Sequence, residues 1–253
     1  MCGRYVSRTE KQRIAETFHA QIVPEDYDPD FVPDYNVAPQ TMQPVIRRSR
    51  DTGNRELARL RWGLVPFWAK DTKIAYSTIN ARAESLATSP TYREALKHRR
   101  CLVPADAFYE WRQIDKKTKQ PYAIALENNE MMAFAGLWER WPLKREKDEK
   151  TGPYLETYTI ITTDPNELME PFHDRMPAIL SPKDFARWLG ETEETQPMLP
   201  LHLVTDLLKP FPAEKMKAWK VGNKVGNTRN NSPDLLLPLE ENPPTTPSLF
   251  DQS

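Results

Sequence analysis

Proline is the residue that most restricts how this chain can fold, because 24 of its 253 residues are proline while 8 are glycine. Each proline fixes one backbone dihedral and removes one amide donor, which interrupts helices and central strands. The stretch 23–44 holds several prolines and aspartates, so we predict an extended connection there rather than a helix or a strand. The composition as a whole predicts a rigid chain that is rich in loops.

Helix and strand patterns lie between these prolines. Apolar side chains at Ile14, Ala15 and Phe18 have a helical spacing, which predicts a short amphipathic helix over 10–20. Runs rich in β-branched and aromatic residues predict strands over 57–65 and 156–163, and a β-hairpin made of 122–127 and 131–137 around Asn128-Asn129.

Three dipeptides place a capping residue before a proline that suits the first helical turn, and we expect a short helix after each: Ser89-Pro90, Asp164-Pro165 and Ser181-Pro182. Strands and helices alternate irregularly, without the βαβ period of a doubly wound sheet and without an internal repeat. The pattern therefore predicts an α+β fold. We expect one domain over 1–240, followed by a flexible tail over 241–253 that has little to bury.

The net charge of −1 gives the chain no overall positive field that would attract a polyanion. Any nucleic-acid surface must therefore be local. The candidates are Arg47, Arg48 and Arg50, the basic run 97–100, and single arginines beside aromatic residues. We interpret the runs 116–119 and 144–150 as solvated faces.

Cys2 and Cys101 are the two cysteines, which is too few for a disulfide framework, and no paired-cysteine spacing indicates a zinc site. We expect no metal and no cofactor, and Cys101 should be a small buried apolar side chain. The first twenty residues lack the apolar core of a signal peptide, and no run approaches the length of a membrane span. These features predict a cytoplasmic protein without a membrane partner.

Cys2 directly follows the initiator methionine and precedes a glycine. Removal of Met1 would leave an α-amine and a thiol on one residue, with pKa values near ~8 and ~8.5, so both have a reactive fraction at physiological pH. With an aldehyde, the amine forms an imine and the thiol closes on the imine carbon to give a thiazolidine, favoured by the proximity of the two groups. Taken alone, a cysteine at position 2 is better explained as an accident of sequence that has no chemical role.

Several blocks of polar and aromatic residues accompany Cys2. In chain order they are Met1-Cys-Gly-Arg-Tyr, Tyr35-Asn-Val-Ala-Pro-Gln, Arg61-Trp-Gly-Leu-Val-Pro-Phe-Trp-Ala, Ile79-Asn-Ala-Arg-Ala-Glu, Arg100-Cys-Leu-Val-Pro-Ala-Asp-Ala-Phe-Tyr-Glu-Trp and Phe172-His-Asp-Arg-Met-Pro. Together they closely resemble the SRAP family, named for SOS response-associated peptidases, from residue 2 to about residue 239.

The resemblance implies a largely antiparallel, barrel-like β core with short peripheral helices. It also implies a DNA-damage protein that recognises the open aldehyde of an abasic site in single-stranded DNA and crosslinks to it, with DNA as its partner at the nucleoid. By motif match, Cys2 is the nucleophile, Asn80 positions it, Glu110 is the acid/base group and His173 acts on the sugar. The peptidase label then describes self-processing that exposes Cys2, beside an activity of the abasic-site lyase type.

The residue types fit these roles, although each has a plainer interpretation. Glu110 lies between two aromatic residues that could raise its pKa, or it could be a buried ion-pair partner. His173 could protonate the sugar ring oxygen, or it could be structural. Asn80 offers a donor and an acceptor for orienting an amine, or it could cap a turn.

The DNA contacts are predicted around these residues. Arg4, Arg82 and Arg175 flank three of them and would hold phosphates. The resemblance makes Trp68 a stacking wedge against the bases beside the lesion, with core packing as its alternative. We expect Trp62 rather than Trp68 in the core.

Two features depart from the family pattern. The stretch 141–152 is a charged insertion, and Thr246-Pro-Ser-Leu-Phe faintly resembles a sliding-clamp-binding peptide, with Thr where Gln is expected, so an incidental tail is its alternative. A covalent cap needs only a monomer. Two other functions remain open: a cysteine peptidase with an N-terminal nucleophile, and a single-stranded DNA-binding module that forms no covalent bond.

Overall fold

The computed structural model describes residues 2–23, 32–143, 153–191 and 202–239, and the architecture in these ranges is α+β. Its strands are β1 (Tyr5–Ser7), β2 (Gln21–Ile22), β3 (Asp34–Val37), β4 (Met42–Arg48), β5 (Arg55–Trp62), β6 (Asn80–Arg82), β7 (Arg100–Ala105), β8 (Ala107–Gln113), β9 (Lys119–Leu126), β10 (Met132–Pro142), β11 (Tyr154–Thr163), β12 (Met176–Pro177) and β13 (Met216–Lys220). Its helices are α1 (Lys11–Phe18), α2 (Arg93–His98), α3 (Phe185–Leu189) and α4 (His202–Thr205), with 3-10 turns η2 (Lys73–Tyr76), η3 (Ala83–Ser85), η4 (Pro182–Asp184), η6 (Ala213–Lys215), η7 (Asn223–Gly226) and η8 (Pro233–Leu236).

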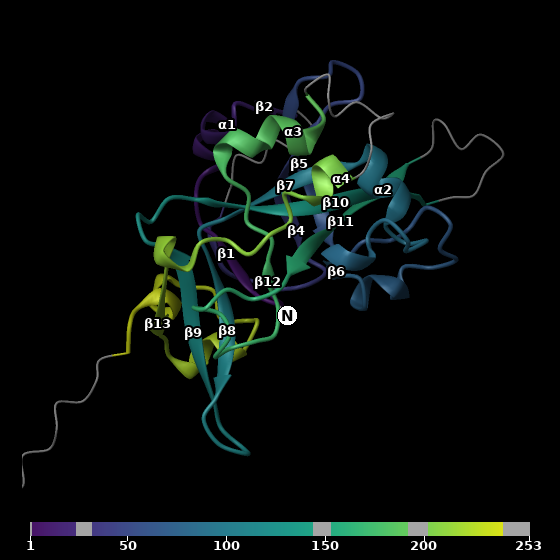
Figure 1. The fold of residues 1–253 in the computed structure, drawn as a ribbon. Helices are drawn as coiled ribbons and strands as arrows, with labels where there is room; N and C mark the ends of the chain where they lie inside the picture. The colour runs from purple at the N-terminus through teal and green to yellow at the C-terminus, as the bar shows by residue number, and fades with distance from the viewer. Residues whose placement is uncertain (1, 24–31, 144–152, 192–201, 240–253) are drawn as a thin grey trace, which may run out of the picture.

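Five strands close into a barrel (Figure 1). Antiparallel pairs run in the order β5-β4-β7-β10-β11, and a parallel pair between β11 and β5 completes the ring. Closure leaves no strand of this ring with an unpaired edge. The barrel-like, largely antiparallel core that the resemblance implied is therefore confirmed.

A second sheet, in the order β13-β9-β8-β1-β3, continues directly from the barrel. Asp106 is the single residue between β7 of the barrel and β8 of the second sheet. Its carboxylate accepts hydrogen bonds from the amides of Arg8 and Thr9, at 2.8 and 3.1 Å. The bend between the sheets is thereby tied to the segment that follows β1.

Aromatic side chains fill the junction of the two sheets. Tyr5 of β1 packs edge-on against Trp62 at 5.3 Å between ring centroids, and its hydroxyl lies 2.7 Å from that of Tyr158. All three side chains are fully buried. The core position of Trp62 is confirmed, and Cys101 is buried in the same cluster as expected.

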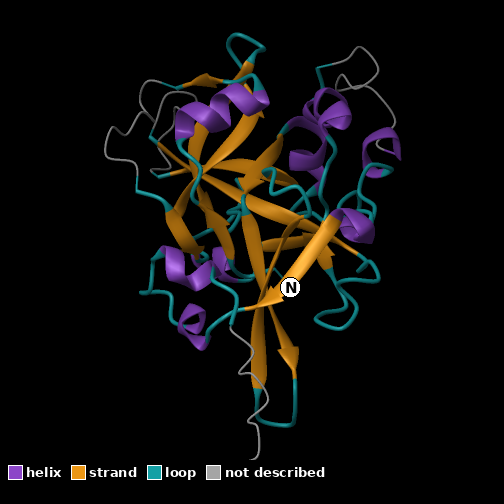
Figure 2. Cartoon of the chain, turned by 90° about the vertical axis from the view of Figure 1, so that its left-hand side faces the viewer, coloured by secondary structure: helices purple, strands orange, loops and turns teal. Residues whose placement is uncertain are grey.

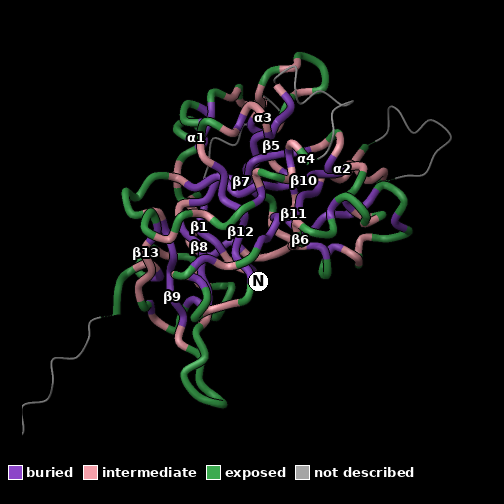
Figure 3. The backbone as a smooth tube through the Cα atoms, viewed as in Figure 1, coloured by how far each residue is buried: buried purple, intermediate pink, exposed green. Residues whose placement is uncertain are grey.

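Short helices cover the outside of the strands (Figure 2). The helix predicted over 10–20 is confirmed as α1, and its residue Phe18 stacks on Phe185 of α3 at 5.3 Å. Buried residues follow the strands, whereas the turn joining β8 and β9 is exposed (Figure 3). No helix within the described ranges is long and apolar enough to cross a membrane.

The predicted strands over 57–65 and 156–163 are confirmed as β5 and β11, with boundaries shifted by a few residues. Short helices follow Ser89-Pro90 and Ser181-Pro182 as expected. The prediction of a helix after Asp164-Pro165 is wrong, because that segment forms only turns. The tail over 241–253, with its clamp-like peptide, and most of the charged insertion lie outside the described residues.

The predicted hairpin of 122–127 and 131–137 is also wrong. A turn does form at Asn129, whose amide donates to the carbonyl of Leu126 at 3.0 Å. The two strands then separate, because β9 pairs with β8 and β13 while β10 pairs with β7 and β11. Both edges of each strand are occupied, so the turn crosses between sheets. The connection predicted over 23–44 contains β3 and the start of β4 and is wrong to that extent.

Gly136 lies at the tightest approach in the barrel wall, where a Cβ atom would come within 2.9 Å of the Cys101 sulfur and 3.0 Å of the Thr159 carbonyl oxygen. Overpacking of a filled core costs about 1–3 kcal/mol. We therefore expect Gly136→Ala to lower the free energy of unfolding by that amount, measured by urea denaturation. Gly222→Ala is the control, since nothing lies within 4 Å of its Cβ position. Equal effects of the two substitutions would contradict the packing argument.

Candidate functional site

The start of the chain is held between two other segments. Asn80 donates a hydrogen bond from its side-chain nitrogen to the Cys2 carbonyl oxygen at 2.9 Å. On the other side, the amide of Tyr109 donates to the Arg4 carbonyl at 3.0 Å, and the Cys2 sulfur lies 3.9 Å from the same oxygen. Cys2 is fully buried in the chain that carries Met1. Strands β6 and β8 thus fix the position of Cys2.

Asn80 begins β6, where it pairs in parallel with Ile160 of the barrel strand β11. Because side chains alternate along a strand, Asn80 and Arg82 share one face of β6 while Ala81 is buried on the other. The side-chain oxygen of Asn80 is buried and accepts no hydrogen bond from the described residues. A buried acceptor without a donor is uncommon in folded proteins. The Asn80 oxygen belongs to the same side chain whose nitrogen donates to the Cys2 carbonyl.

Glu110 lies on β8 opposite Tyr122 of β9 and is buried. Burial raises the pKa of its carboxyl group above the ordinary value. Burial also raises the pKa of the Cys2 thiol, and the negative charge of Glu110 raises it further. The two groups are therefore close enough to interact, and each is favoured in its neutral form.

His173 lies in the turn between β11 and β12. The adjoining Phe172 packs edge-on against Tyr122 at 4.8 Å between centroids, which places this turn beside the strand that faces Glu110. The imidazole Nδ1 accepts from the Arg175 amide at 3.1 Å and lies 2.6 Å from an oxygen of Asp174. Burial lowers the pKa of His173 below its ordinary value, so the neutral imidazole dominates at pH 7.

Lys119 is a residue of this site that the sequence analysis missed. Its positive charge acts on both groups, lowering the pKa of Glu110 and that of His173, although burial is the larger cause for each. The sequence analysis assigned it to a solvated run, and Lys119 is indeed exposed. Only its position at the start of β9 brings it near Glu110 and His173, and no signal in the sequence marks that position.

The predicted phosphate ligands are placed differently from one another. Arg82 is exposed on the face of β6 that also carries Asn80. Arg4 instead donates to the side-chain oxygen of Asn36 at 2.7 Å and to the Val225 carbonyl at 2.8 Å. It therefore ties β1 to the C-terminal part of the described chain. Contact of these arginines with DNA stays a prediction.

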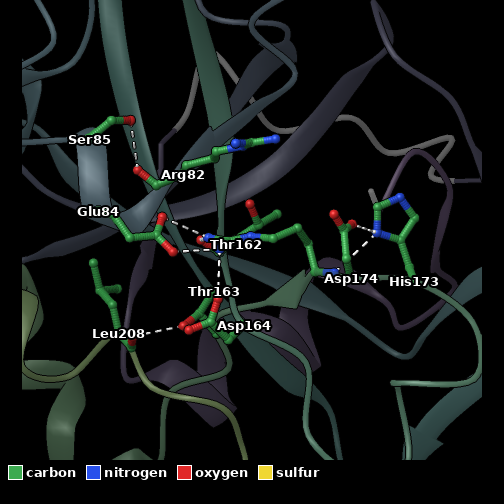
Figure 4. A network of polar contacts seen from close by, with 10 residues as sticks. Arg82, Glu84, Ser85, Thr162, Thr163, Asp164, His173, Asp174 and Leu208 are labelled. Atoms are coloured by element: carbon green, nitrogen blue, oxygen red, sulfur yellow. Dashed lines mark hydrogen bonds and ion pairs between the residues drawn. The ribbon is translucent and has the colours of Figure 1, made fainter.

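Arg175 is buried in a polar network that it forms with Glu84, Asp164 and Thr162. Figure 4 shows these three partners, with His173 in the same view. The Arg175 guanidinium pairs with both oxygens of Glu84, and it donates to Asp164 at 2.9 Å and to the Thr162 carbonyl at 2.6 Å. Glu84 follows β6 directly, in η3. The network thus links the turn that carries His173 to the strand that carries Asn80.

Trp68 is 46% exposed and Phe67 is 54% exposed, so both aromatic faces are available at the surface. The indole nitrogen of Trp68 donates to the Pro90 carbonyl at 3.4 Å. Trp62 is buried as predicted, and stacking of DNA bases on Trp68 stays a prediction. The sequence analysis did not single out Phe67, although its position next to Trp68 was the available signal.

The family model for "SOS response associated peptidase (SRAP)" matches residues 1–228. The chain belongs to the SRAP family. It is 44% identical over 237 residues to "Abasic site processing protein YoqW" of Bacillus subtilis, covering 93% of this chain and 99% of that protein. It is 33% identical over 239 residues to "Abasic site processing protein HMCES" of Gallus gallus, covering 83% of this chain and 67% of that protein.

Solved structures share the SRAP fold described above. A protein from Bacteroides thetaiotaomicron, 31% identical, superimposes with a TM-score of 0.80 and covers 94% of this chain and 99% of its own. A protein from Bordetella bronchiseptica, 26% identical, has a TM-score of 0.67 with 87% and 100% coverage. In this SRAP chain Cys2, Asn80, Glu110 and His173 come from four separate segments, and the contacts described above bring these segments together.

Within the described part of the chain, no three His, Cys, Asp or Glu side chains are grouped so that they could hold a metal ion. The Cys2 site offers the functional groups of four side chains. They comprise a thiol, a carboxyl group whose pKa burial raises, an imidazole whose pKa burial lowers, and an amide.

The Glu84–Arg175 pair yields a prediction about pH. Glu84→Gln should destabilise the fold by roughly 1 kcal/mol at pH 7, because buried Arg175 loses a charged acceptor while solvent screens the exposed Glu84 carboxylate. The hydrogen bond from Arg175 lowers the pKa of Glu84 below its ordinary value. This stabilisation is therefore complete above the unfolded-state pKa, about 4.3, and is lost as the pH falls through the lower folded-state pKa. Urea denaturation of both proteins from pH 7 to pH 3 should show the difference shrinking.

Glu94→Gln serves as the matched control, since Glu94 forms an exposed ion pair with Lys97. It should leave stability nearly unchanged. A stability difference for Glu84→Gln that persisted undiminished at pH 3 would show that the ion pair is not its source.

Proposed function

We propose that this protein processes abasic sites in DNA by forming a covalent bond between its mature N-terminal Cys2 and the open-chain aldehyde of the damaged sugar. Family membership and the names of the relatives support abasic-site processing. The buried side-chain oxygen of Asn80 is the observation that carries the covalent step, because no described residue donates to it and the same side chain holds Cys2. An α-amine on Cys2 would supply that donor.

Removal of Met1 is required for this chemistry. While Met1 is attached, the Cys2 nitrogen is an amide without a nucleophilic lone pair, and burial favours the protonated thiol. Hydrolysis of the Met1–Cys2 bond consumes one water and releases methionine, and it leaves an amine and a thiol on one residue. Whether the protein or an aminopeptidase performs this hydrolysis, the product is the same 1,2-aminothiol.

The reaction with the lesion then balances as a condensation. The amine adds to the aldehyde carbon, the carbinolamine loses water to form an imine, and the thiol adds to the imine carbon while its proton passes to nitrogen. The thiazolidine product equals protein plus DNA minus one water. Ring closure is intramolecular, which favours it over attack by an external thiol.

The pKa directions assign proton transfers to the two flanking groups. Burial raises the pKa of Glu110, which increases its protonated fraction, and in that form it can protonate the departing hydroxyl of the carbinolamine. His173 is favoured as the neutral imidazole, so it can take the proton of the sugar's C1 hydroxyl and return it to the ring oxygen as the ring opens. Asn80 orients the amine, and Trp68 and Phe67 offer exposed faces on which neighbouring bases can stack, each contributing roughly 1–3 kcal/mol.

The two rival functions make different demands on Cys2. A peptidase would turn over peptide substrates and leave no lasting DNA adduct. A non-covalent DNA-binding module would keep its activity without the Cys2 thiol. The non-covalent module does not require the α-amine that would donate to Asn80, whereas the peptidase would share it. We favour the covalent function over the peptidase because the relatives are named as abasic site processing proteins.

The decisive experiment mixes the processed protein with a single-stranded oligonucleotide that bears one abasic site. We expect a species that survives a denaturing gel and whose intact mass equals protein without Met1 plus DNA minus one water. Cys2→Ala, and a protein that retains Met1, should form no such species. An intact oligonucleotide without the lesion is the substrate control. Absence of any adduct from protein proven to lack Met1 would overturn the proposal.

A second prediction concerns Asn80. Asn80→Ala should slow adduct formation by at least about tenfold, equivalent to about 1.4 kcal/mol, because the amine and the Cys2 carbonyl lose their orienting partner. Single-turnover adduct kinetics measure this effect, and thermal melting checks the fold. Asn223→Ala, at an exposed asparagine of η7, is the matched control and should react at the wild-type rate. An unchanged rate for Asn80→Ala would remove Asn80 from the mechanism.

A further inference from the structure

A cavity of about 310 Å³ opens between the turn that joins β4 to β5, the end of α2 and the end of α3. Its wall includes three arginines, a lysine, a histidine and a tryptophan: Arg48, Arg50, Lys97, His98, Arg100 and Trp138. No aspartate or glutamate among the described residues lines it. A concave surface with cations of one sign concentrates the electrostatic field and attracts anions.

The fold brings two distant basic runs together to build this cavity. The sequence places Arg48 and Arg50 about fifty residues before Lys97 and Arg100. Strand β4 ends at Arg48 and the antiparallel strand β7 begins at Arg100, with Arg47 paired to Cys101. The end of one strand and the start of its antiparallel neighbour lie at the same edge of a sheet. Both runs therefore face one cavity although the whole chain is nearly neutral.

Arg50 is a cation of this wall that forms no close ion pair with a described carboxylate, although the charge of Glu139 acts on it from further away. It lies over the Trp138 ring at 5.2 Å, beside Arg47 at 4.2 Å from the same ring. Of the nearby carboxylates, Glu139 pairs with Arg99 at 2.7 Å, and Glu94 pairs at 3.1 Å with Lys97, itself a residue of the wall. Burial and the positive charges around it lower the pKa of Arg50 below its ordinary value. The cluster has a cationic excess that an anion would relieve.

Arg48 is held in place at the rim. Its side chain donates to the Gly53 carbonyl at 3.0 Å and to the Gly190 carbonyl at 2.8 Å. These two bonds occupy part of a guanidinium that carries five N–H donors, which leaves others available to a ligand. An arginine fixed in this way loses little side-chain entropy when it binds an oxyanion.

We propose that this cavity, hereafter the basic pocket, is a phosphate-binding site separate from the Cys2 site. Fixed guanidinium groups match the oxygens of a phosphate and bind it through charge-assisted hydrogen bonds. Arginines cover the Trp138 ring, so no base can stack there, and recognition is confined to the phosphate. That phosphate can come from a DNA backbone or from a free phosphate-bearing molecule. Phosphate binding itself does not depend on the function proposed for Cys2.

The basic pocket lies apart from the Cys2 site. Arg47, behind the pocket, pairs with Glu156 of β11, whereas Asn80 pairs with Ile160 further along that strand. Four residues of extended strand span about 13 Å. In Figure 1, α3 and β5 lie in the upper part of the molecule, whereas the N-terminus lies well below them. None of the residues that line the pocket belongs to the Cys2 site.

The test measures binding of inorganic pyrophosphate to the full chain by calorimetry in a chloride buffer. Arg50→Gln should weaken pyrophosphate binding by about tenfold or more, the loss expected for hydrogen bonds to a charged group. Arg229→Gln is the matched control, with the same change of charge at an exposed arginine outside the pocket, and it should bind like the wild type. Lys97→Gln, on a different element of the wall, should also weaken binding and replaces Arg50→Gln should that variant fail to fold.

A second arm identifies the source of the phosphate. The salt dependence of binding to undamaged single-stranded DNA is measured for the same variants, since loss of one phosphate contact lowers the slope by about one. A lower slope for Arg50→Gln together with weaker pyrophosphate binding supports a DNA backbone as occupant. Weaker pyrophosphate binding with an unchanged slope supports a free phosphate compound. Pyrophosphate binding that is absent, or equal in Arg50→Gln, Lys97→Gln and Arg229→Gln, overturns the phosphate site, whatever the adduct assay of Cys2 shows.

Discussion

The structure depends on how the first strand is anchored in the barrel. The Tyr5 hydroxyl meets that of Tyr158 at 2.7 Å in a fully buried setting, and the Tyr5 ring packs on Trp62. A buried polar group that lost its partner would cost about 1–3 kcal/mol, so this pair allows one register for β1. With the register fixed, Cys2 has one position, three residues before Tyr5. The barrel therefore acts as a rigid support for the chain terminus, where the chemistry is proposed.

Burial also sets the electrostatics of the Cys2 site. It raises the pKa of Glu110, lowers that of His173 and raises that of the Cys2 thiol, so each group is favoured without charge. Neutral groups suit proton transfer, because a protonated carboxyl can donate and a neutral imidazole can accept. The fixed charges near the site belong to the Glu84–Arg175 ion pair, which is separate from these three groups. That pair links the elements carrying Asn80 and His173 without adding a net charge.

The net charge of the chain does not reveal where its arginines lie or what they contact. Arg175 and Arg4 are engaged with protein acceptors, whereas Arg48 and Arg50 face a cavity that no described carboxylate lines. The chain as a whole has a net charge of −1. Attraction for an anion at a protein surface depends on the local field rather than on the total charge. A near-neutral protein can thus present a phosphate-binding surface at one end and a nearly uncharged reactive site elsewhere.

The sequence by itself determined the short-range features and singled out the candidate reactive residues. The helical spacing in α1, the β-branched run of β11 and the burial of Trp62 follow from local pattern, and the motif blocks singled out Cys2, Asn80, Glu110 and His173. Only the tertiary structure decided which strands pair, and the expected hairpin failed because β9 and β10 are each paired on both edges by strands distant in sequence. It also decided that Lys119 approaches the site and that two basic runs share one cavity. Strand pairing depends on partners far along the chain, and local propensity carries no information about them.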